Sequence, residues 1–189
     1  SNIKLSNYNW FNLGGPAEYF FKPESKAQLI DFLKENKKNK LKLTILGAGS
    51  NTLIRDNGIK GVVIKLGSNF SQINLIGKDV LEVGAATLDR KISTFAKNHG
   101  IGNLEFLSCI PGSIGGAIIM NSGCYGNDIS KVLISLKAVD MNKCIEKEFK
   151  RDEIEFSYRG SNLNENLIIT SVKLQGKSGN KEEIEKRQN

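Results

Sequence analysis

The sequence predicts an α+β fold, in which short strands paired in hairpins are mixed with a few helices. Two observations predict it: the runs of alternating apolar residues are short and end at turn residues, and helical periodicity appears in two internal segments. A doubly wound parallel sheet would need a regular alternation of strands and helices. The pattern therefore favours mixed and antiparallel sheets with flanking helices.

The first predicted helix covers 25–38, where Ser25 and Gln28 fit a capping box. The second follows Thr87, which we expect to cap it, and ends near Gly100, at a position suited to a left-handed residue. The tail 181–188 has helical composition, but its Ile184 has little apolar company. The predicted strands cover 41–45, 61–66, 73–76, 80–83, 132–141, 144–149 and 167–174, with a turn at Asn142-Lys143.

Composition narrows the function classes. The 189 residues suffice for one ordinary domain or two small lobes, and 39% hydrophobic and 25% charged residues are typical of soluble globular proteins. The net charge is +7, but the lysines are scattered rather than gathered in a basic block. We therefore expect a solvated surface and no nucleic-acid partner, while a mildly positive cleft would suit a diphosphate. With no signal segment and no apolar run long enough for a bilayer, we expect a cytoplasmic protein without a membrane partner.

The three cysteines and the single histidine do not form a metal-binding pattern. Cys109, Cys124 and Cys144 are widely spaced and odd in number, so we expect free thiols in a reducing compartment and no metal. His99 lies at a helix end, where an exposed histidine is favoured by the helix dipole.

The first glycine-rich loop, 46–51, has the sequence LGAGSN and follows a predicted strand. Glycines permit positive φ and let main-chain N–H groups approach a ligand, and Ser50 and Asn51 add side-chain donors. These donors suit a pyrophosphate. The loop is not the Rossmann fingerprint, because position 52 is threonine. Taken alone, a tight turn without a ligand explains it equally well.

The second glycine-rich loop, 110–117, has the sequence IPGSIGGA and continues through 121–126 as NSGCYG. Its small residues indicate backbone packed flat against a neighbour, and alone it could be a close contact between a helix and a sheet. Two such loops, separated by roughly sixty residues, point to a dinucleotide held from two sides.

Six motifs, in this order, resemble the UDP-N-acetylenolpyruvoylglucosamine reductase family. This family lies within the flavoproteins that share the vanillyl-alcohol-oxidase, or PCMH-type, FAD domain. The motifs are NLGGPA at 12–17, LGAGSN at 46–51, LEF at 104–106, IPGSIGGA at 110–117, NSGCYG at 121–126 and FSYR at 156–159.

The resemblance implies a two-lobed PCMH-type FAD-binding domain. The first lobe would be 1–66 and the second 67–178, while 179–189 would begin a linker or helix toward a substrate-binding domain. FAD would be bound non-covalently. The implied pyrophosphate loop is Gly47, Ala48, Gly49, Ser50, Asn51 and Thr52. The rest of the cofactor would be lined by Pro111, Gly112, Ser113, Gly115, Gly116, Ala117, Asn121 and Gly123.

The implied reaction is the NADPH-dependent reduction of UDP-N-acetylglucosamine enolpyruvate to UDP-N-acetylmuramate for peptidoglycan synthesis, on a monomer. Arg159 would be catalytic, since its guanidinium fork matches the substrate carboxylate on which charge develops. Tyr158 and Arg159 would contact the substrate. Spacing alone favours a surface salt bridge of Arg159 instead, with Asp152, Glu153 or Glu155.

The family's serine proton donor and C-terminal glutamate belong to a third domain. We therefore expect FAD binding but little turnover from these 189 residues alone. Cys109 replaces a common glycine, Cys124 a common alanine and Asn9 a common threonine of the family pattern. Two alternatives remain: a stand-alone or degenerate FAD-binding protein without reductase activity, and an oxidase of the same superfamily, in which FAD is often attached through His or Cys.

Overall fold

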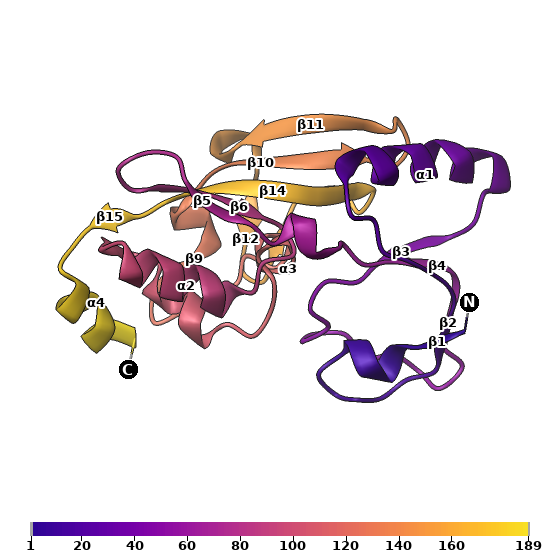
Figure 1. The fold of residues 1–189 in the computed structure, drawn as a ribbon, viewed down its shortest axis with the longest axis horizontal. Helices are drawn as coiled ribbons and strands as arrows, with labels where there is room; N and C mark the ends of the chain where they lie inside the picture. The colour runs from indigo at the N-terminus through magenta and orange to yellow at the C-terminus, as the bar shows by residue number, and fades with distance from the viewer. Residues whose placement is uncertain (1, 189) are drawn as a thin grey trace.

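The computed structural model describes residues 2–188, which fold around two larger sheets (Figure 1). The first sheet has the order β1-β2-β4-β3 and is mixed, because β2, β3 and β4 run parallel and β1 pairs antiparallel with β2. Its strands are β1 Ile3–Lys4, β2 Pro16–Phe21, β3 Leu43–Ile45 and β4 Ile59–Ile64.

The second sheet is entirely antiparallel and has the order β11-β10-β14-β6-β5. Its strands are β5 Ile73–Leu75, β6 Val80–Gly84, β10 Leu133–Asp140, β11 Ile145–Lys150 and β14 Leu167–Gln175. Three short pairs complete the strands: β7 Ile101–Gly102 with β15 Lys177–Ser178, β8 Gly123–Cys124 with β9 Asn127–Asp128, and β12 Phe156–Ser157 with β13 Gly160–Ser161.

The helices lie beside the sheets, which confirms the predicted α+β class. They are α1 Lys26–Asn39, α2 Asp89–Asn98, α3 Ile114–Ile119 and α4 Lys181–Gln188. Short 3-10 turns cover η1 Leu5–Tyr8, η2 Ser68–Phe70, η3 Glu105–Cys109, η4 Ile129–Lys131 and η5 Arg151–Glu153. Among the described residues, no helix is long and apolar enough to cross a lipid bilayer.

Helix α1 begins as predicted, with one difference at its cap. The Ser25 hydroxyl accepts a hydrogen bond from the Gln28 amide at 3.2 Å. The Gln28 side chain, however, accepts from the Glu24 amide rather than from that of Ser25, so the predicted capping box was half right. The helix ends at Asn39, and the capping residue Lys40 is left-handed, with a φ of 52°.

The predicted cap of α2 was wrong. The helix starts at Asp89 after Leu88, which makes no side-chain cap, and the buried Thr87 hydroxyl lacks a hydrogen-bond partner in the described structure. Gly100 has the predicted positive φ, 66°. Besides the two-residue strands, two longer elements were missed. They are β2, where apolar and polar residues do not alternate cleanly, and α3, whose glycines hide the buried face of Ile114, Ala117 and Ile118.

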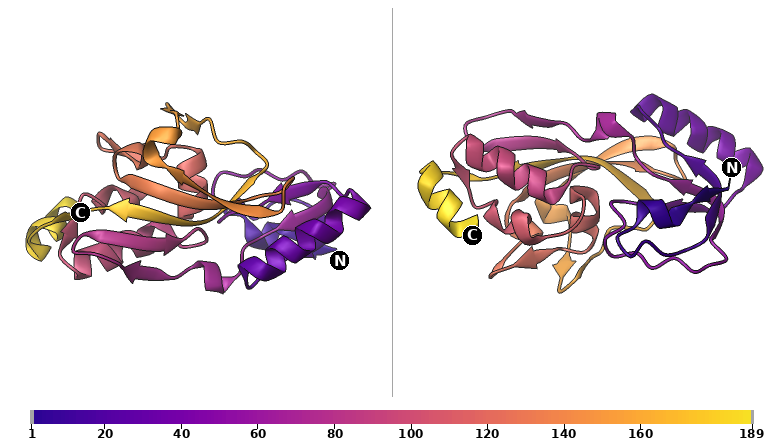
Figure 2. Two further views of the ribbon diagram at one scale, coloured as in Figure 1. Left: turned by 90° about the horizontal axis from the view of Figure 1, so that it is seen from above. Right: turned by 60° about the horizontal axis from the view of Figure 1, so that its bottom comes forward.

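Three apolar clusters form the core. The largest lies between the antiparallel sheet and helices α2 and α3, and a smaller one lies under the first sheet. The third joins the two sheets: Leu29 and Leu33 of α1 pack with Ile64 of β4 and with Val139 and Ile168 of the second sheet. Figure 2 shows α1 beside the end of that sheet. The Lys26–Glu146 ion pair, at 2.9 Å, spans the same junction.

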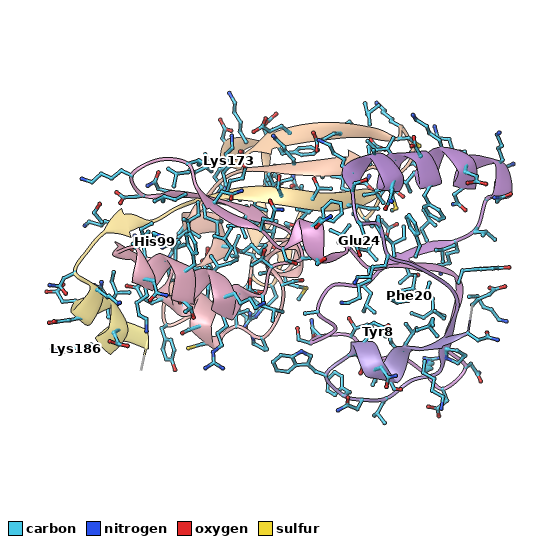
Figure 3. The ribbon with its side chains drawn as sticks, in the orientation of Figure 1. Tyr8, Phe20, Glu24, His99, Lys173 and Lys186 are labelled. Atoms are coloured by element: carbon cyan, nitrogen blue, oxygen red, sulfur yellow. The ribbon has the colours of Figure 1, made fainter. Side chains whose placement is uncertain are left out.

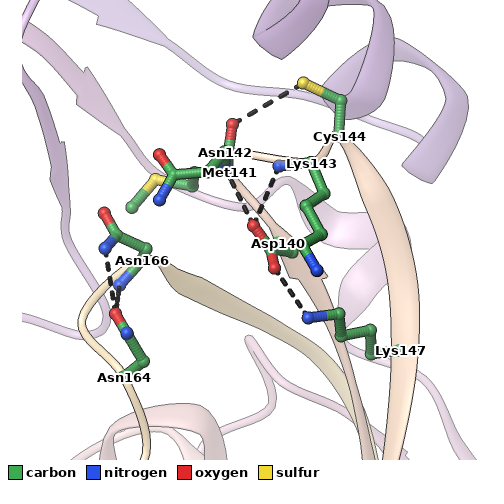
Figure 4. A network of polar contacts seen from close by, with 8 residues as sticks. All are labelled: Asp140, Met141, Asn142, Lys143, Cys144, Lys147, Asn164 and Asn166. Carbon is green, nitrogen blue, oxygen red and sulfur yellow. Dashed lines mark hydrogen bonds and ion pairs between the residues drawn. The ribbon is translucent and has the colours of Figure 1, made fainter.

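The turn between β10 and β11 is fixed by Asp140 (Figure 4). Its Oδ1 accepts hydrogen bonds from the amides of Asn142 and Lys143, both at 2.9 Å, and its Oδ2 lies 2.8 Å from Lys147 Nζ. These contacts lower the pKa of Asp140 to about 2, with the Lys147 hydrogen bond as the largest cause. The carboxylate therefore stays charged at neutral pH, and the predicted turn is confirmed.

The tail itself gives Ile184 little apolar company, as predicted, but distant segments supply it. Helix α4 packs beside α2 and η3, and its Ile184 is fully buried. Two ion pairs flank it: Lys97–Glu185 at 2.9 Å and Arg187–Glu105 at 3.0 Å. The apolar partners come from segments distant in sequence, which the local pattern of 181–188 does not reveal.

Ile184→Ala should therefore undock α4. Removing a buried isoleucine side chain costs about 2–5 kcal/mol, while the two surface ion pairs contribute about 1 kcal/mol or less each. We expect faster tryptic cleavage at Lys186 and Arg187 and a lower urea midpoint. Ile145→Ala, at a half-exposed isoleucine, is the control and should change neither; equal sensitivity of both variants would contradict the docking.

Candidate functional site

A cleft of about 1090 Å³ contains both glycine-rich loops. This volume is slightly above the usual range for small-molecule sites, about 300–1,000 Å³, and leaves room for an extended ligand. Twelve predicted cofactor residues line it: Gly47, Ala48, Gly49, Ser50, Asn51, Thr52, Pro111, Gly112, Ser113, Gly115, Gly116 and Ala117.

The first loop follows the carboxyl end of β3 and lies on η1. The Trp10 amide donates to the Gly49 carbonyl at 3.1 Å. Gly49 has a φ of 75°, and a Cβ there would lie 2.3 Å from the Tyr8 carbonyl oxygen. Tyr8 in turn packs against Phe20 with ring centroids 4.8 Å apart (Figure 3). Only glycine fits where the loop crosses η1.

The amide groups of this loop are available to a ligand. Within residues 2–188, no hydrogen bond uses a main-chain N–H of residues 47–52 as donor. Convergent N–H groups on a glycine-rich loop form an anion-binding concavity. The loop can therefore hold a phosphate group without a dedicated side chain.

The second loop is anchored to the antiparallel sheet and touches the first. The Ile114 amide donates to the Thr87 carbonyl at 2.9 Å, and the Gly115 amide donates to that of Ala85 at 3.0 Å. The Ser50 hydroxyl donates to the Pro111 carbonyl at 2.7 Å, which joins the two loops directly. A Cβ on Gly116 would meet nothing within 4 Å, so the backbone there faces open space.

Two lysines in the cleft were missed by the sequence analysis. Lys22 and Lys65 directly follow the parallel strands β2 and β4, and both line the cleft beside the first loop. The Lys65 ammonium donates to the Gly47 carbonyl. Burial, and then the nearby charge of Lys22, lowers the pKa of Lys65. The signal was their position after two neighbouring parallel strands, whose carboxyl ends commonly form ligand sites.

Asp89 was also missed. It is fully buried at the start of α2, lines the cleft, and both carboxyl oxygens lack a hydrogen-bond partner among the described residues. A Cβ on Gly112 would lie 3.2 Å from its Oδ2. Burial raises the pKa of Asp89 to about 7. A strongly shifted carboxyl in a cleft is a common feature of functional sites.

Arg159 lines the same cleft from the turn between β12 and β13. Its φ is 57°, and its guanidinium lies 5.6 Å from the ring centroid of Tyr158, which is 91% exposed. In the described part of the chain, no ion pair involves Arg159, so the alternative salt bridge with a neighbouring carboxylate is not formed. The guanidinium is available to a ligand anion.

Three predicted site residues lie outside the described lining of the cleft. Tyr158 projects into solvent. Asn121 instead connects two segments, as its amide donates to the Ser157 carbonyl at 3.2 Å and its Oδ1 accepts from the Ser130 amide at 3.0 Å. Gly123 pairs in β8, where a Cβ would lie 2.3 Å from the Asn127 carbonyl oxygen.

The comparisons with known proteins match this geometry. A family model described as "FAD binding domain" matches residues 17–144, which contain both glycine-rich loops. The chain belongs to the FAD-binding domain family. FAD, the cofactor expected from the sequence, is thereby supported at the level of the family.

Curated relatives of this FAD-binding domain carry the name UDP-N-acetylenolpyruvoylglucosamine reductase. The relative from Pelagibacter ubique is 48% identical over 96% of the chain and 59% of its own length. That from Rickettsia bellii is 43% identical over 100% of the chain and 62% of its length. The chain thus spans about three fifths of the curated relatives it matches.

Solved structures agree on the fold. The crystal structure of UDP-N-acetylenolpyruvylglucosamine reductase from Thermus caldophilus matches with a TM-score of 0.87 and 31% identity, over 100% of the FAD-binding domain and 66% of that chain. Cholesterol oxidase from Brevibacterium sterolicum matches with a TM-score of 0.64 and 16% identity, over 90% of this chain and 36% of the oxidase chain. The oxidase likeness shows a shared fold and nothing more.

Gly49→Ala and Gly126→Ala form a matched pair, because both glycines have a φ of 75°. At Gly126 a Cβ would meet nothing within 4 Å. We expect Gly126→Ala to cost about 1–2 kcal/mol, because an L-residue is disfavoured in the left-handed conformation. Gly49→Ala should cost clearly more in urea unfolding, because the new Cβ collides with the main chain of Tyr8 and Asn9. Equal losses would show that the contact with η1 does not constrain the loop.

Asp89 should make stability depend on pH. Its pKa rises from 3.8 in the unfolded chain to about 7 in the fold, so the native state binds the proton more tightly. The stabilising contribution of Asp89 to the free energy of unfolding is complete below about pH 4. It is lost as the pH rises to about 7, and the loss is on the order of 4 kcal/mol. Unfolding free energies across this range should fall less steeply for Asp89→Asn. Asp56→Asn, at an exposed site, should keep the original slope, and parallel curves for all three proteins would refute the assignment.

Proposed function

We propose that this chain is the FAD-binding part of an enzyme that reduces UDP-N-acetylglucosamine enolpyruvate to UDP-N-acetylmuramate with NADPH, for peptidoglycan synthesis. The observation that carries the proposal is the hydrogen bond between Ser50 and Pro111, which joins two glycine-rich loops around one cleft. The names of the curated relatives support the substrate. We further propose that this enzyme is a monomer and works in the cytoplasm.

The residues of the cleft fit FAD. The unused amides of residues 47–52 suit the pyrophosphate, and Lys65 adds a cation beside them. Apolar Ile110, Ile119 and Ile169 line the cleft near the second loop, where a flat ring system would find a hydrophobic surface. We assign lobe 1 to 1–66, lobe 2 to 67–178 and the start of a connection to a further domain to 179–189.

The chemistry that FAD supplies when bound is hydride exchange between NADPH and the enolpyruvyl double bond. The chain's own residues bind and orient the reactants. Gly112, Ser113 and Gly116 hold the cofactor through the backbone, and Asn121 and Gly123 keep the adjoining segment in place. None of these assignments requires a metal ligand.

Arg159 binds the substrate carboxylate in this proposal. Its guanidinium stays protonated and offers two parallel N–H donors, and no protein carboxylate in the described chain pairs with it. As charge develops on the carboxylate, a donor already in place can contribute about 2.7–4 kcal/mol. Tyr158 adjoins the guanidinium and would contact the substrate from the solvent side.

The purified chain should bind FAD and show a flavin absorption band after gel filtration. Lys65→Met should weaken FAD binding about tenfold, the scale of one charge-assisted hydrogen bond, and the loss should shrink as salt is raised. Lys60→Met removes an exposed charge from the same strand and should leave the dissociation constant unchanged. Failure of the unaltered chain to retain any flavin would end the proposal.

The substrate is tested on the same FAD-loaded chain. Added UDP-N-acetylglucosamine enolpyruvate should perturb the flavin spectrum, and Arg159→Ala should remove that perturbation while FAD binding remains. A flavin spectrum that responds to NADPH but not to the enolpyruvate would keep the FAD assignment and refute the substrate.

A further inference from the structure

Two of the three cysteines lie on neighbouring elements, at positions 109 and 124, and Cys109 directly precedes the cleft residue Ile110. Cys109 ends η3, and Cys124 ends β8, which packs against η3. The Cys124 thiol donates to the Phe106 carbonyl at 3.2 Å. In a 3-10 helix the carbonyl of one residue points toward the amide of the residue three positions later, so the Phe106 carbonyl lies beside Cys109. Cys109 is also one of the neighbours that raise the pKa of the Cys124 thiol, as this proximity requires.

The two thiols differ in exposure, as a reactive and a resolving cysteine would. Cys109 is exposed and lies 3.6 Å from the Ser108 hydroxyl. Cys124 is half-buried, and burial is the main cause that raises its pKa, followed by the neighbouring Cys109, while Arg159 acts in the opposite direction. An oxidant therefore reaches Cys109 first, with Cys124 waiting beside it.

Cys144 provides an internal comparison. It is buried in the cluster that joins the two sheets, and its thiol contacts the Met141 carbonyl at 3.6 Å (Figure 4). Neither its burial nor its neighbours favour reaction with a solvent oxidant. All three thiols are free, as expected from the sequence. Only Cys109 and Cys124 lie on elements that contact each other.

We propose that Cys109 and Cys124 form a reversible oxidation site for peroxides. The Cys109 sulfur attacks a peroxide oxygen, the O–O bond breaks, and the products are a cysteine sulfenic acid and water. The Cys124 sulfur then attacks the Cys109 sulfur, the S–O bond breaks, and a second water leaves as the disulfide forms. Two thiols are oxidised by two electrons and one peroxide is reduced; a small dithiol reductant reverses the change by exchange.

The location gives this bond a consequence for the cleft. The segment 110–123 between the two cysteines contains Pro111, Gly112, Ser113, Gly115, Gly116 and Ala117, which all line the cleft. A disulfide would close a covalent ring around this segment and fix its two ends together. The inference does not rest on the proposed reaction, because it needs only the two sulfurs and a peroxide.

The test treats the folded chain with stoichiometric hydrogen peroxide and maps the peptides by mass spectrometry without reduction. We expect a Cys109–Cys124 linked peptide, loss of two titratable thiols per chain, and recovery of both with dithiothreitol. Cys144→Ser, the matched control, should behave like the unaltered chain. Cys109→Ser and Cys124→Ser should each form no Cys109–Cys124 disulfide. If Cys124→Ser folds poorly because the residue is half-buried, Cys109→Ser at the exposed position still tests the proposal.

A trivalent arsenical that bridges two close thiols provides a second measurement. Phenylarsine oxide should block both Cys109 and Cys124 in one molecule and should protect them from alkylation. Oxidation of Cys109 to the sulfinic acid with Cys124 still titratable, or disulfide-linked dimers as the main product, would overturn the proposal.

Discussion

The relative position of the two sheets is the constraint on which the cleft depends. The first glycine-rich loop follows β3 of the mixed sheet, and the second is anchored to β6 through Ala85. Leu29 and Leu33 of α1 hold these sheets together. Each buried leucine contributes about 1.5–3 kcal/mol, against about 1 kcal/mol for the Ser50–Pro111 hydrogen bond. The apolar cluster therefore sets the distance between the loops, and the hydrogen bond sets their alignment.

The site is built from backbone more than from side chains, and this explains its composition. A Cβ on Gly47 would approach the Ser113 hydroxyl to 3.0 Å, and one on Gly49 would collide with η1. Small residues are thus required on the side of each loop that faces protein, not only on the side that faces a ligand. Because amides carry no net charge, the loops can converge on one anion without repelling each other.

The fold and the two loops could be predicted from the sequence because their signals are local. Ser25 begins a helix that its own neighbours complete, and Asn142-Lys143 joins two alternating strands. Lys65, Asp89 and Ile184 could not be predicted this way, since each depends on which distant segments meet. Lys65 matters because three strands run parallel, and Ile184 because α2 and η3 lie beside the tail. The prediction that Thr87 caps α2 was wrong because the core buries this residue and its side chain does not reach the helix end.

The charges of the cleft show why an anion would complete it. Its ionisable lining consists of Lys22, Lys65, Asp89, Arg159 and Glu165. Asp89, with a pKa near 7, carries less than a full negative charge near neutral pH, so it opposes an incoming phosphate less than an exposed carboxylate would. Lys65 contacts a carbonyl rather than a carboxylate, and its partial burial disfavours the charged form. A diphosphate beside the unused amides of residues 47–52 would favour the charged form of Lys65 and gain from it, so ligand binding and lysine protonation should reinforce each other.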